Sequence, residues 1–207
     1  MKVSSPRFRL LILLSILGIV GVYAFPRYYR ILNSPKGLST TGGEELFIKI
    51  PCPYFSQQDP KWRSETIGES GGSIGSYGCT LCAAAMALNA FGISCNPQTL
   101  NHQLSAKSGF TSSGLLVWES LRSLAGDSFS VVLKDRPSHS YLDARLKEGT
   151  PVIAKVLWNG EIWHWVLVTG KEANQYLVAD PLVPDDPHSP ATSYPEGFFA
   201  VRHLTRR

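Results

Sequence analysis

The segment "SIGSYGCTLCAAAMALNAFG", residues 73 to 92, places a cysteine where a glycine-rich loop becomes a run of small and apolar residues. From Cys79 to Phe91 there is neither Gly nor Pro, and five of the residues are Ala. Gly92 stands where the residue after a helix C-terminus belongs. The segment therefore predicts a helix over residues 79–91 with Cys79 in its first turn, and the alanines after Cys82 make that helix narrow enough to pack tightly onto a sheet.

Other elements follow from capping residues and apolar patterns. Residues 46–55 alternate apolar and polar side chains and end in prolines, which predicts an edge strand. Asn96 followed by Pro97 opens a second helix that runs to about residue 106. A third helix is predicted over residues 113–124, a short strand over 129–133, and a helix from the Ser138 cap to about residue 147.

The C-terminal third is rich in β-branched and aromatic residues. It predicts strands over residues 151–157, 163–170, 175–180 and 197–204, and Asn159-Gly160 predicts a tight hairpin between the first two. Because helices come first and an antiparallel sheet comes last, the fold class expected is α+β.

The chain is long enough for one domain with appendages. Basic residues precede an apolar stretch from Leu10 to Phe25, and Val22-Tyr23-Ala24 offers small residues for a signal peptidase. Arg27, Arg30 and two tyrosines after the stretch are instead typical of a membrane anchor. We therefore expect a signal peptide or an N-terminal anchor over residues 1–26, a linker over 27–45 and the globular domain over 46–207, membrane-anchored outside the cytoplasm or secreted.

The charge of the chain is confined to its N-terminal part. Residues 1–45 hold six Lys and Arg against two Glu, and residues 46–207 hold fourteen basic and fourteen acidic residues. The globular part is therefore neutral, and it carries no basic stripe with interleaved aromatic residues. Nucleic-acid binding is not expected.

Cys79 has the surroundings of a reactive thiol. At the first turn of a helix it lies near unpaired N–H groups and the positive end of the helix dipole, which favour thiolate over thiol. Gly78 allows the backbone to approach a substrate closely, and the amides after it lie where an oxyanion can be held.

A thiolate that acts as a nucleophile needs a partner that takes and returns protons. His164 lies on a predicted strand between Trp163 and Trp165, so that its side chain faces opposite to theirs. Asp180 ends the next predicted strand and can orient the imidazole from an adjacent position in an antiparallel pair. The order along the chain is Cys, His, Asp.

Four segments together resemble the C39-like cysteine peptidases, which have a papain-like fold. They are "PYFSQQDPKW" at 53–62, "SYGCTLCAAAM" at 76–86, "HWVLVTG" at 164–170 and "ADP" at 179–181. The resemblance implies that Cys79 is the nucleophile, that His164 is the general base and acid, and that Asp180 orients the imidazole. It also implies that Gln57, in preference to the adjacent Gln58, donates to the oxyanion hole. The members that cut double-glycine leaders of bacteriocins carry an ATPase cassette and several membrane spans that are not seen here, so the resemblance does not extend to leader processing.

The resulting hypothesis is a hydrolase that cleaves a peptide or amide bond through a Cys79 thioester, with no metal or organic cofactor. Its partners would be a peptide or amide substrate and, if the N-terminal segment is not cleaved, a membrane. An acyl or peptidyl transferase would use the same thioester, and an inactive C39-like binding module would keep the fold without the chemistry.

The remaining cysteines leave two further possibilities open. Cys52 comes from a distant segment and could form a disulfide with Cys82 or Cys95. Cys79 and Cys82 also match C-x-x-C, which occurs in thiol-disulfide exchangers and metal sites.

Overall fold

A computed structural model describes residues 35–183 and 186–207 of the chain. The expected signal peptide or anchor over residues 1–26 lies outside the described residues. Among the residues described, no helix is both long and apolar enough to cross a membrane. Lys36–Arg207 forms one unit, which contains every helix and strand of the described residues.

The elements occur in an order that places most helices before most strands. They are β1 (Thr41–Lys49), α2 (Ile74–Tyr77), α3 (Cys79–Ala90), α4 (Pro97–Ser105), α5 (Trp118–Ala125), β2 (Phe129–Asp135), α6 (His139–Lys147), β3 (Val152–Trp158), β4 (Ile162–Ala179), β5 (Ser189–Pro190), the 3₁₀ turn η1 (Ala191–Ser193) and β6 (Ala200–Arg206). The expected α+β class is confirmed.

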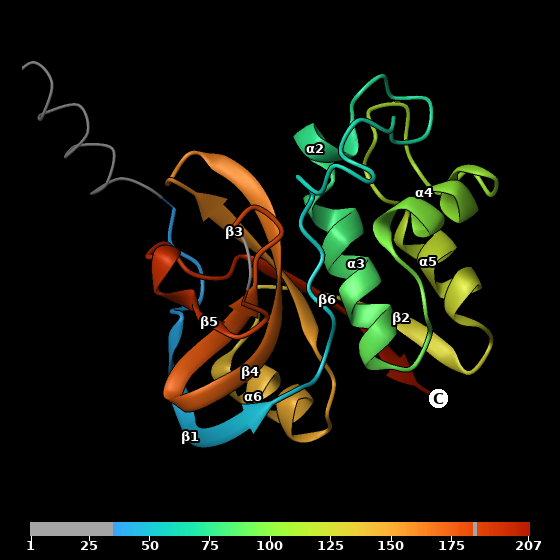
Figure 1. Cartoon of the computed structure of the whole chain (residues 1–207). Helices are drawn as coiled ribbons and strands as arrows, with labels where there is room; N and C mark the ends of the chain where they lie inside the picture. The colour runs from blue at the N-terminus through green and yellow to red at the C-terminus, as the bar shows by residue number, and fades with distance from the viewer. Residues whose placement is uncertain (1–34, 184–185) are drawn as a thin grey trace, which may run out of the picture. The chain divides into compact units, whose positions relative to one another are not determined.

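The strands form one antiparallel sheet in the order β1-β4-β3-β6-β2, with the short β5 paired to β4. Side chains from α3, α4 and α5 pack on one face of this sheet against Ile153, Leu167 and Leu204. Side chains of α6 pack on the other face against Val152, Ala154 and Val166. Figure 1 shows α3, α4 and α5 gathered on one side of the sheet. Ile153 of β3 therefore faces one side of the sheet, and its neighbours Val152 and Ala154 face the other. Neighbouring side chains of a strand point to opposite faces because the period of a strand is two residues.

The predicted helices at Cys79, Pro97 and Ser138 are confirmed, and so are the caps of the latter two. The Asn96 side chain accepts a hydrogen bond from the Thr99 amide, and the Ser138 side chain accepts one from Tyr141. Asn159 and Gly160 both have positive φ angles, 52° and 72°, as the central positions of a type I′ turn require, and the loop between the paired Trp158 and Ile162 is residues 159–161.

Two predicted boundaries are wrong. The helix expected over residues 113–124 begins only at Trp118, because Gly114 has a left-handed φ of 79° and Phe110 pairs with Leu116 in an isolated bridge. The linker expected over residues 27–45 extends too far, because β1 begins at Thr41 and residues 41–45 belong to that strand.

The glycines that suggested a linker are instead required by close packing against α6. A Cβ on Gly43 would lie 2.3 Å from Asp143 Oδ2, and one on Gly42 would lie 2.7 Å from His139 Nε2. β1 lies at the edge of the sheet, as predicted for residues 46–55, but it ends at Lys49.

The strands predicted over 163–170 and 175–180 are two arms of one element, β4. His164 and Asp180 are sixteen positions apart and would be about 53 Å apart in a fully extended strand, at about 3.3 Å per residue. The side chains of His164 and Asp180 are nevertheless 2.6 Å apart, so β4 turns back on itself. The turn lies at Ala173, whose φ of 52° is left-handed. This reversal brings the end of β4 back to its beginning (Figure 1).

Candidate active site

Cys79 is the first residue of α3, and Gly78 alone separates it from the short helix α2. Gly78 joins the two helices with its amide bonded to the Ile74 carbonyl at 2.7 Å. A Cβ at position 78 would lie 2.4 Å from that carbonyl oxygen. A side chain at position 78 would therefore disturb the junction that positions Cys79. This is a different role for Gly78 from the one expected from the sequence, which was to let the backbone approach a substrate closely.

The Cys79 thiol is partly buried, lies 3.9 Å from the Thr80 hydroxyl and interacts electrostatically with His164. Burial raises its pKa, but the hydrogen bond with His164, the charge of that imidazole and a hydrogen bond from the Trp165 backbone outweigh burial, and the net pKa is lowered from 9.0. The thiolate is thus favoured mainly by its partner. Nothing in the sequence pattern indicates the contribution of the Trp165 amide.

His164 lies on β4 opposite Val156 of β3, and it is 2% exposed whereas Trp163 is 49% exposed. The predicted opposite facing of these two side chains is confirmed. The Nε2 atom of His164 is 2.6 Å from Asp180 Oδ1, which leaves Nδ1 for the thiol. Burial lowers the pKa of His164, but the hydrogen bonds and charges of Asp180 and Cys79 outweigh it and raise the pKa from 6.5 to about 9.

Asp180 directly follows β4 and its carboxylate is fully engaged. Oδ1 accepts from His164 and, at 2.8 Å, from the Leu182 amide, and Oδ2 accepts from the Tyr194 hydroxyl. Burial raises the pKa of this carboxyl, but the hydrogen bond and charge of His164, helped by the other two donors, lower it below 3.8. The carboxylate therefore stays ionised and fixed in orientation.

Two tyrosines support this corner of the site, and sequence reasoning missed both roles. Tyr194, in the loop after η1, is buried and stands near His164, with ring centroids 6.5 Å apart. Tyr54 donates to the backbone oxygens of Asp180 and Val183, at 2.9 and 2.6 Å. A single tyrosine in a proline-rich loop carries no sequence signal of such a contact.

Gln57 is buried at 3% exposure, whereas Gln58 is exposed. The Gln57 backbone amide bonds the Pro181 carbonyl at 2.9 Å, and its Nε2 bonds the Gly75 carbonyl at 2.8 Å. Gln57 thus links the residue after Asp180 to the helix that precedes Cys79. Its Oε1 is buried with no hydrogen-bond partner, so the side-chain amide of Gln57 keeps one unused acceptor between these two segments.

All four cysteines lie in the described residues, and all four are free, so the disulfide considered for Cys52 is not formed. Burial raises the pKa of Cys52 and of Cys95 to about 11 and raises the pKa of Cys82 well above 9.0. Cys82 is fully buried in the core on the α3 face of the sheet. Its burial argues against thiol-disulfide exchange, because the second thiol of such a pair must be reached.

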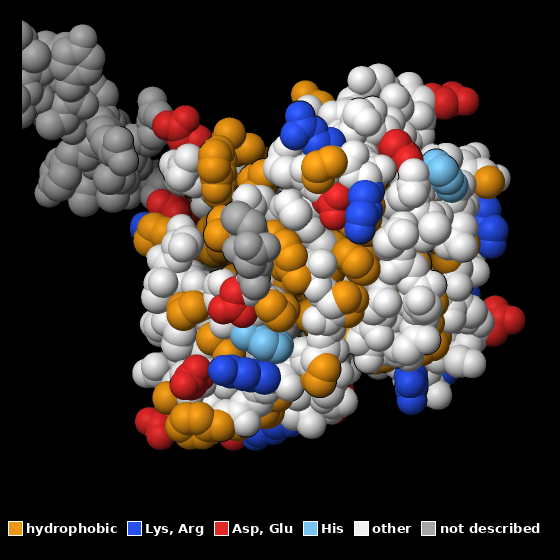
Figure 2. Space-filling model, viewed as in Figure 1, with side chains coloured by type: hydrophobic (Ala, Val, Ile, Leu, Met, Phe, Trp, Pro, Cys, Tyr) orange, Lys and Arg blue, Asp and Glu red, His pale blue; other side chains and the backbone are white. Residues whose placement is uncertain are grey.

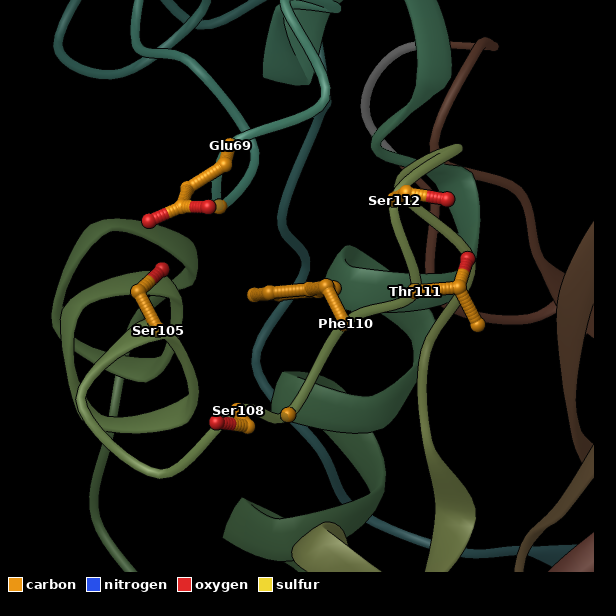
Figure 3. A pocket seen from close by; sticks show the side chains of 8 residues that line it. Glu69, Ser105, Ser108, Phe110, Thr111 and Ser112 are labelled. Carbon is orange, nitrogen blue, oxygen red and sulfur yellow. The ribbon is translucent and has the colours of Figure 1, made fainter.

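A separate pocket of about 340 Å³ lies in the helical part of the molecule, and none of the four predicted site residues lines it. Figure 3 shows Phe110 projecting toward the space between Glu69, Ser105 and Ser108. Within residues 35–183 and 186–207, no group of three or more His, Cys, Asp and Glu side chains is placed to hold a metal ion.

Comparisons with known proteins identify a family and a similar fold. The sequence model of the Peptidase C39 family matches residues 74–189, which include Cys79, His164 and Asp180. A crystal structure from Bacillus anthracis described as a C39-like peptidase superposes with a TM-score of 0.50 and 16% sequence identity, over 79% of this chain and 99% of the other. At that identity the likeness concerns the fold. No curated protein sequence matches the chain.

Proposed function

The chain belongs to the Peptidase C39 family, and we propose that it is a cysteine peptidase that hydrolyses a peptide or amide bond through a thioester on Cys79. His164 acts as general base and acid, Asp180 orients and ionises the imidazole, and Gln57 donates to the oxyanion. The proposal includes a papain-like arrangement of helices and sheet and a location outside the cytoplasm, where the sequence of residues 1–26 would direct the domain.

The chemistry takes two steps on the residues described. His164 takes the thiol proton, and the Cys79 sulfur attacks the carbonyl carbon of the substrate to give a tetrahedral oxyanion. The backbone amide of Cys79 and the Nε2 of Gln57 stabilise that charge. As the C–N bond breaks, His164 gives its proton to the leaving amine, and a thioester remains. Water activated by His164 then attacks the thioester and releases the carboxylic acid and the thiol.

The observation that supports the proposal best is the pair of opposite pKa shifts within one hydrogen-bonded chain. The pKa of Cys79 is lowered from 9.0 while that of His164 is raised to about 9, so both shifts favour transfer of the proton from the sulfur to the imidazole. A thiolate beside an imidazolium is the reactive form that nucleophilic catalysis by cysteine needs. An inert buried cysteine would have the raised pKa of Cys82 instead.

A peptide mixture digested by the full-length protein and followed by mass spectrometry tests the proposal. Wild-type protein and Cys82→Ala are expected to generate new termini, and Cys79→Ala is expected to generate none. Products that carry an added amine would assign acyl transfer instead. Equal digestion by wild type and Cys79→Ala, or none by wild type, would overturn the proposal.

A further inference from the structure

Two thiols lie on the first turn of α3, at Cys79 and Cys82. The Cys82 amide donates to the Gly78 carbonyl at 2.9 Å, so this turn has the hydrogen bond of a regular α-helix. With a rise of about 1.5 Å, about 3.6 residues per turn and a radius of about 2.3 Å, Cα atoms three residues apart in a helix are about 5 Å apart. Cα atoms joined by a disulfide are usually about 4.4–6.8 Å apart, so Cys79 and Cys82 are within bridging distance.

A bridge between these two residues needs only a small adjustment of the helix. The Cβ atoms of residues three apart are about 5–6 Å from each other, and those of a disulfide are about 3.5–4.5 Å apart. The two side chains must therefore approach by about 1–2 Å. The first turn of a helix can move in this way because the amides of its first three residues have no partner within the helix.

The two sulfurs differ in access from solvent. Cys79 is partly buried, whereas Cys82 is 0% exposed and lies in the core on the α3 face of the sheet. The charge of Cys79 contributes to the raised pKa of Cys82, so the two groups interact with each other. Cys82 is therefore closed to thiols of other molecules, but it is next to Cys79 on the same helix.

This arrangement has the parts of a redox-sensing thiol. Such a cysteine is ionised and accessible, and a second thiol beside it captures its oxidised form. Cys79 is the one cysteine of the chain whose pKa is lowered, and burial raises the pKa of both Cys52 and Cys95 to about 11. Cys82 supplies the second thiol, a role that the proposed hydrolysis does not use.

The charge of the surface indicates the kind of oxidant. Figure 2 shows acidic and basic side chains interspersed on the face in view, and residues 46–207 hold fourteen of each sign. A surface of this kind does not concentrate charged molecules near it. A small uncharged hydroperoxide needs no such attraction, and it is small enough to approach a partly buried sulfur.

We propose that a hydroperoxide such as hydrogen peroxide converts Cys79 and Cys82 into a reversible disulfide. The Cys79 thiolate attacks one peroxide oxygen, the O–O bond breaks, hydroxide leaves and Cys79 becomes a sulfenic acid. The Cys82 sulfur then attacks the Cys79 sulfur. The S–S bond forms, the S–O bond breaks, and the hydroxyl group leaves as water with the proton of the Cys82 thiol. Two electrons have passed from the sulfurs to the peroxide.

The disulfide would switch off the proposed peptidase, because a bridged sulfur cannot attack a carbonyl. A thiol reductant restores both cysteines by exchange at the Cys79 sulfur, the accessible one of the two. The inference goes beyond the proposed function and takes from it only the ionised state of Cys79.

Disulfide mapping of the full-length protein tests the inference. The protein is reduced, freed of reductant, treated with hydrogen peroxide, blocked with iodoacetamide and digested for mass spectrometry. We expect the peptide that carries Cys79 and Cys82 to lose two hydrogens and to show fragments joined between these residues. Dithiothreitol should return both thiols to the form that iodoacetamide labels.

Cys82→Ala should change the product of oxidation. Without the second thiol, Cys79 should be oxidised to sulfinic acid, which dithiothreitol does not reverse, so its labelling by iodoacetamide should stay lost. Cys52→Ala and Cys95→Ala are the matched controls and should keep both the bridge and its reversal. If Cys82→Ala does not fold, the map of the wild-type protein still decides.

Three results would overturn the inference: no bridge between Cys79 and Cys82 in wild type, a bridge to Cys52 or Cys95 instead, or full recovery of Cys82→Ala by dithiothreitol. None of these measurements requires peptide cleavage. A Cys79–Cys82 bridge in a protein that cleaves no peptide would therefore overturn the proposed function alone, and cleavage without the bridge would overturn this inference alone.

Discussion

Replacing Asp180 with Asn removes the charge that holds the proton on His164 while keeping the size of the side chain. The hydrogen bond with Asp180 is the largest influence that raises the pKa of His164. The rise from 6.5 to about 9 corresponds to about 2.5 pKa units, or about 3.4 kcal/mol at about 1.36 kcal/mol per unit. This net rise corresponds to about 300-fold in the protonation equilibrium of the imidazole, and Asp180 and Cys79 both contribute to it against the effect of burial.

The sign of the effect on the thiol follows from the same coupling. In the wild type the pKa of Cys79 is lowered, so thiolate is present at pH values below the ordinary 9.0. In Asp180→Asn the imidazole holds its proton less strongly, burial of the sulfur persists, and the thiolate forms at higher pH than in the wild type. Alkylation at pH 6 should therefore slow by about one to two orders of magnitude.

The assay is the rate of carbamidomethylation of Cys79 by iodoacetamide between pH 4 and 10, quantified by mass spectrometry of the Cys79 peptide. Cys52 and Cys95, whose pKa values are about 11, serve as references in the same sample. An identical pH profile for wild type and Asp180→Asn would refute the coupling of Asp180 to the thiol through His164.

Three further changes test other parts of the structure. Tyr194→Phe removes a donor to the Asp180 carboxylate, so the pKa of Asp180 should rise and the acid limb of the activity profile should move to higher pH, as a pH–rate titration would detect. In the wild type Lys171 Nζ lies 2.7 Å from Asp143 Oδ1, and Lys171→Met leaves that buried carboxylate without its cation. The free energy of unfolding, measured by urea denaturation, should fall by about 3–5 kcal/mol, and a fall of less than about 1 kcal/mol would contradict this. Gly78→Ala puts a methyl group against the Ile74 carbonyl and should lower both Tm and the labelling rate of Cys79, whereas an unchanged labelling rate would show that the helix junction does not aim the thiol.

The local part of the fold was predictable from the sequence because its signals are local. The helix at Cys79, the Asn96 and Ser138 caps and the Asn159-Gly160 hairpin depend on residues close to one another in the chain. The start of β1 was not predictable, because Gly42 and Gly43 are explained by side chains of α6 and β4, which lie about a hundred residues or more away. The same composition occurs in flexible linkers.

The candidate site shows the same division. Cys79, His164 and Asp180 could be selected because each residue type has a distinct place in its element. Tyr194, Tyr54 and the Trp165 amide could not, because their contacts depend on the reversal of β4 and the path of the loop after it. Ala173 has a left-handed conformation but gives no sequence signal of a turn, because Gly, Asn and Asp are the residues that favour that conformation.

The most direct test of the central claim is the detection of an acyl-enzyme on Cys79. Full-length protein is mixed with a cleavable peptide, quenched in acid within milliseconds to seconds, and analysed as intact protein and as a digest. We expect an added acyl mass on the Cys79 peptide that forms and decays during turnover and is absent in His164→Ala. Peptide cleavage by wild type with no acyl mass on Cys79, or with the mass on another cysteine, would contradict the proposed mechanism.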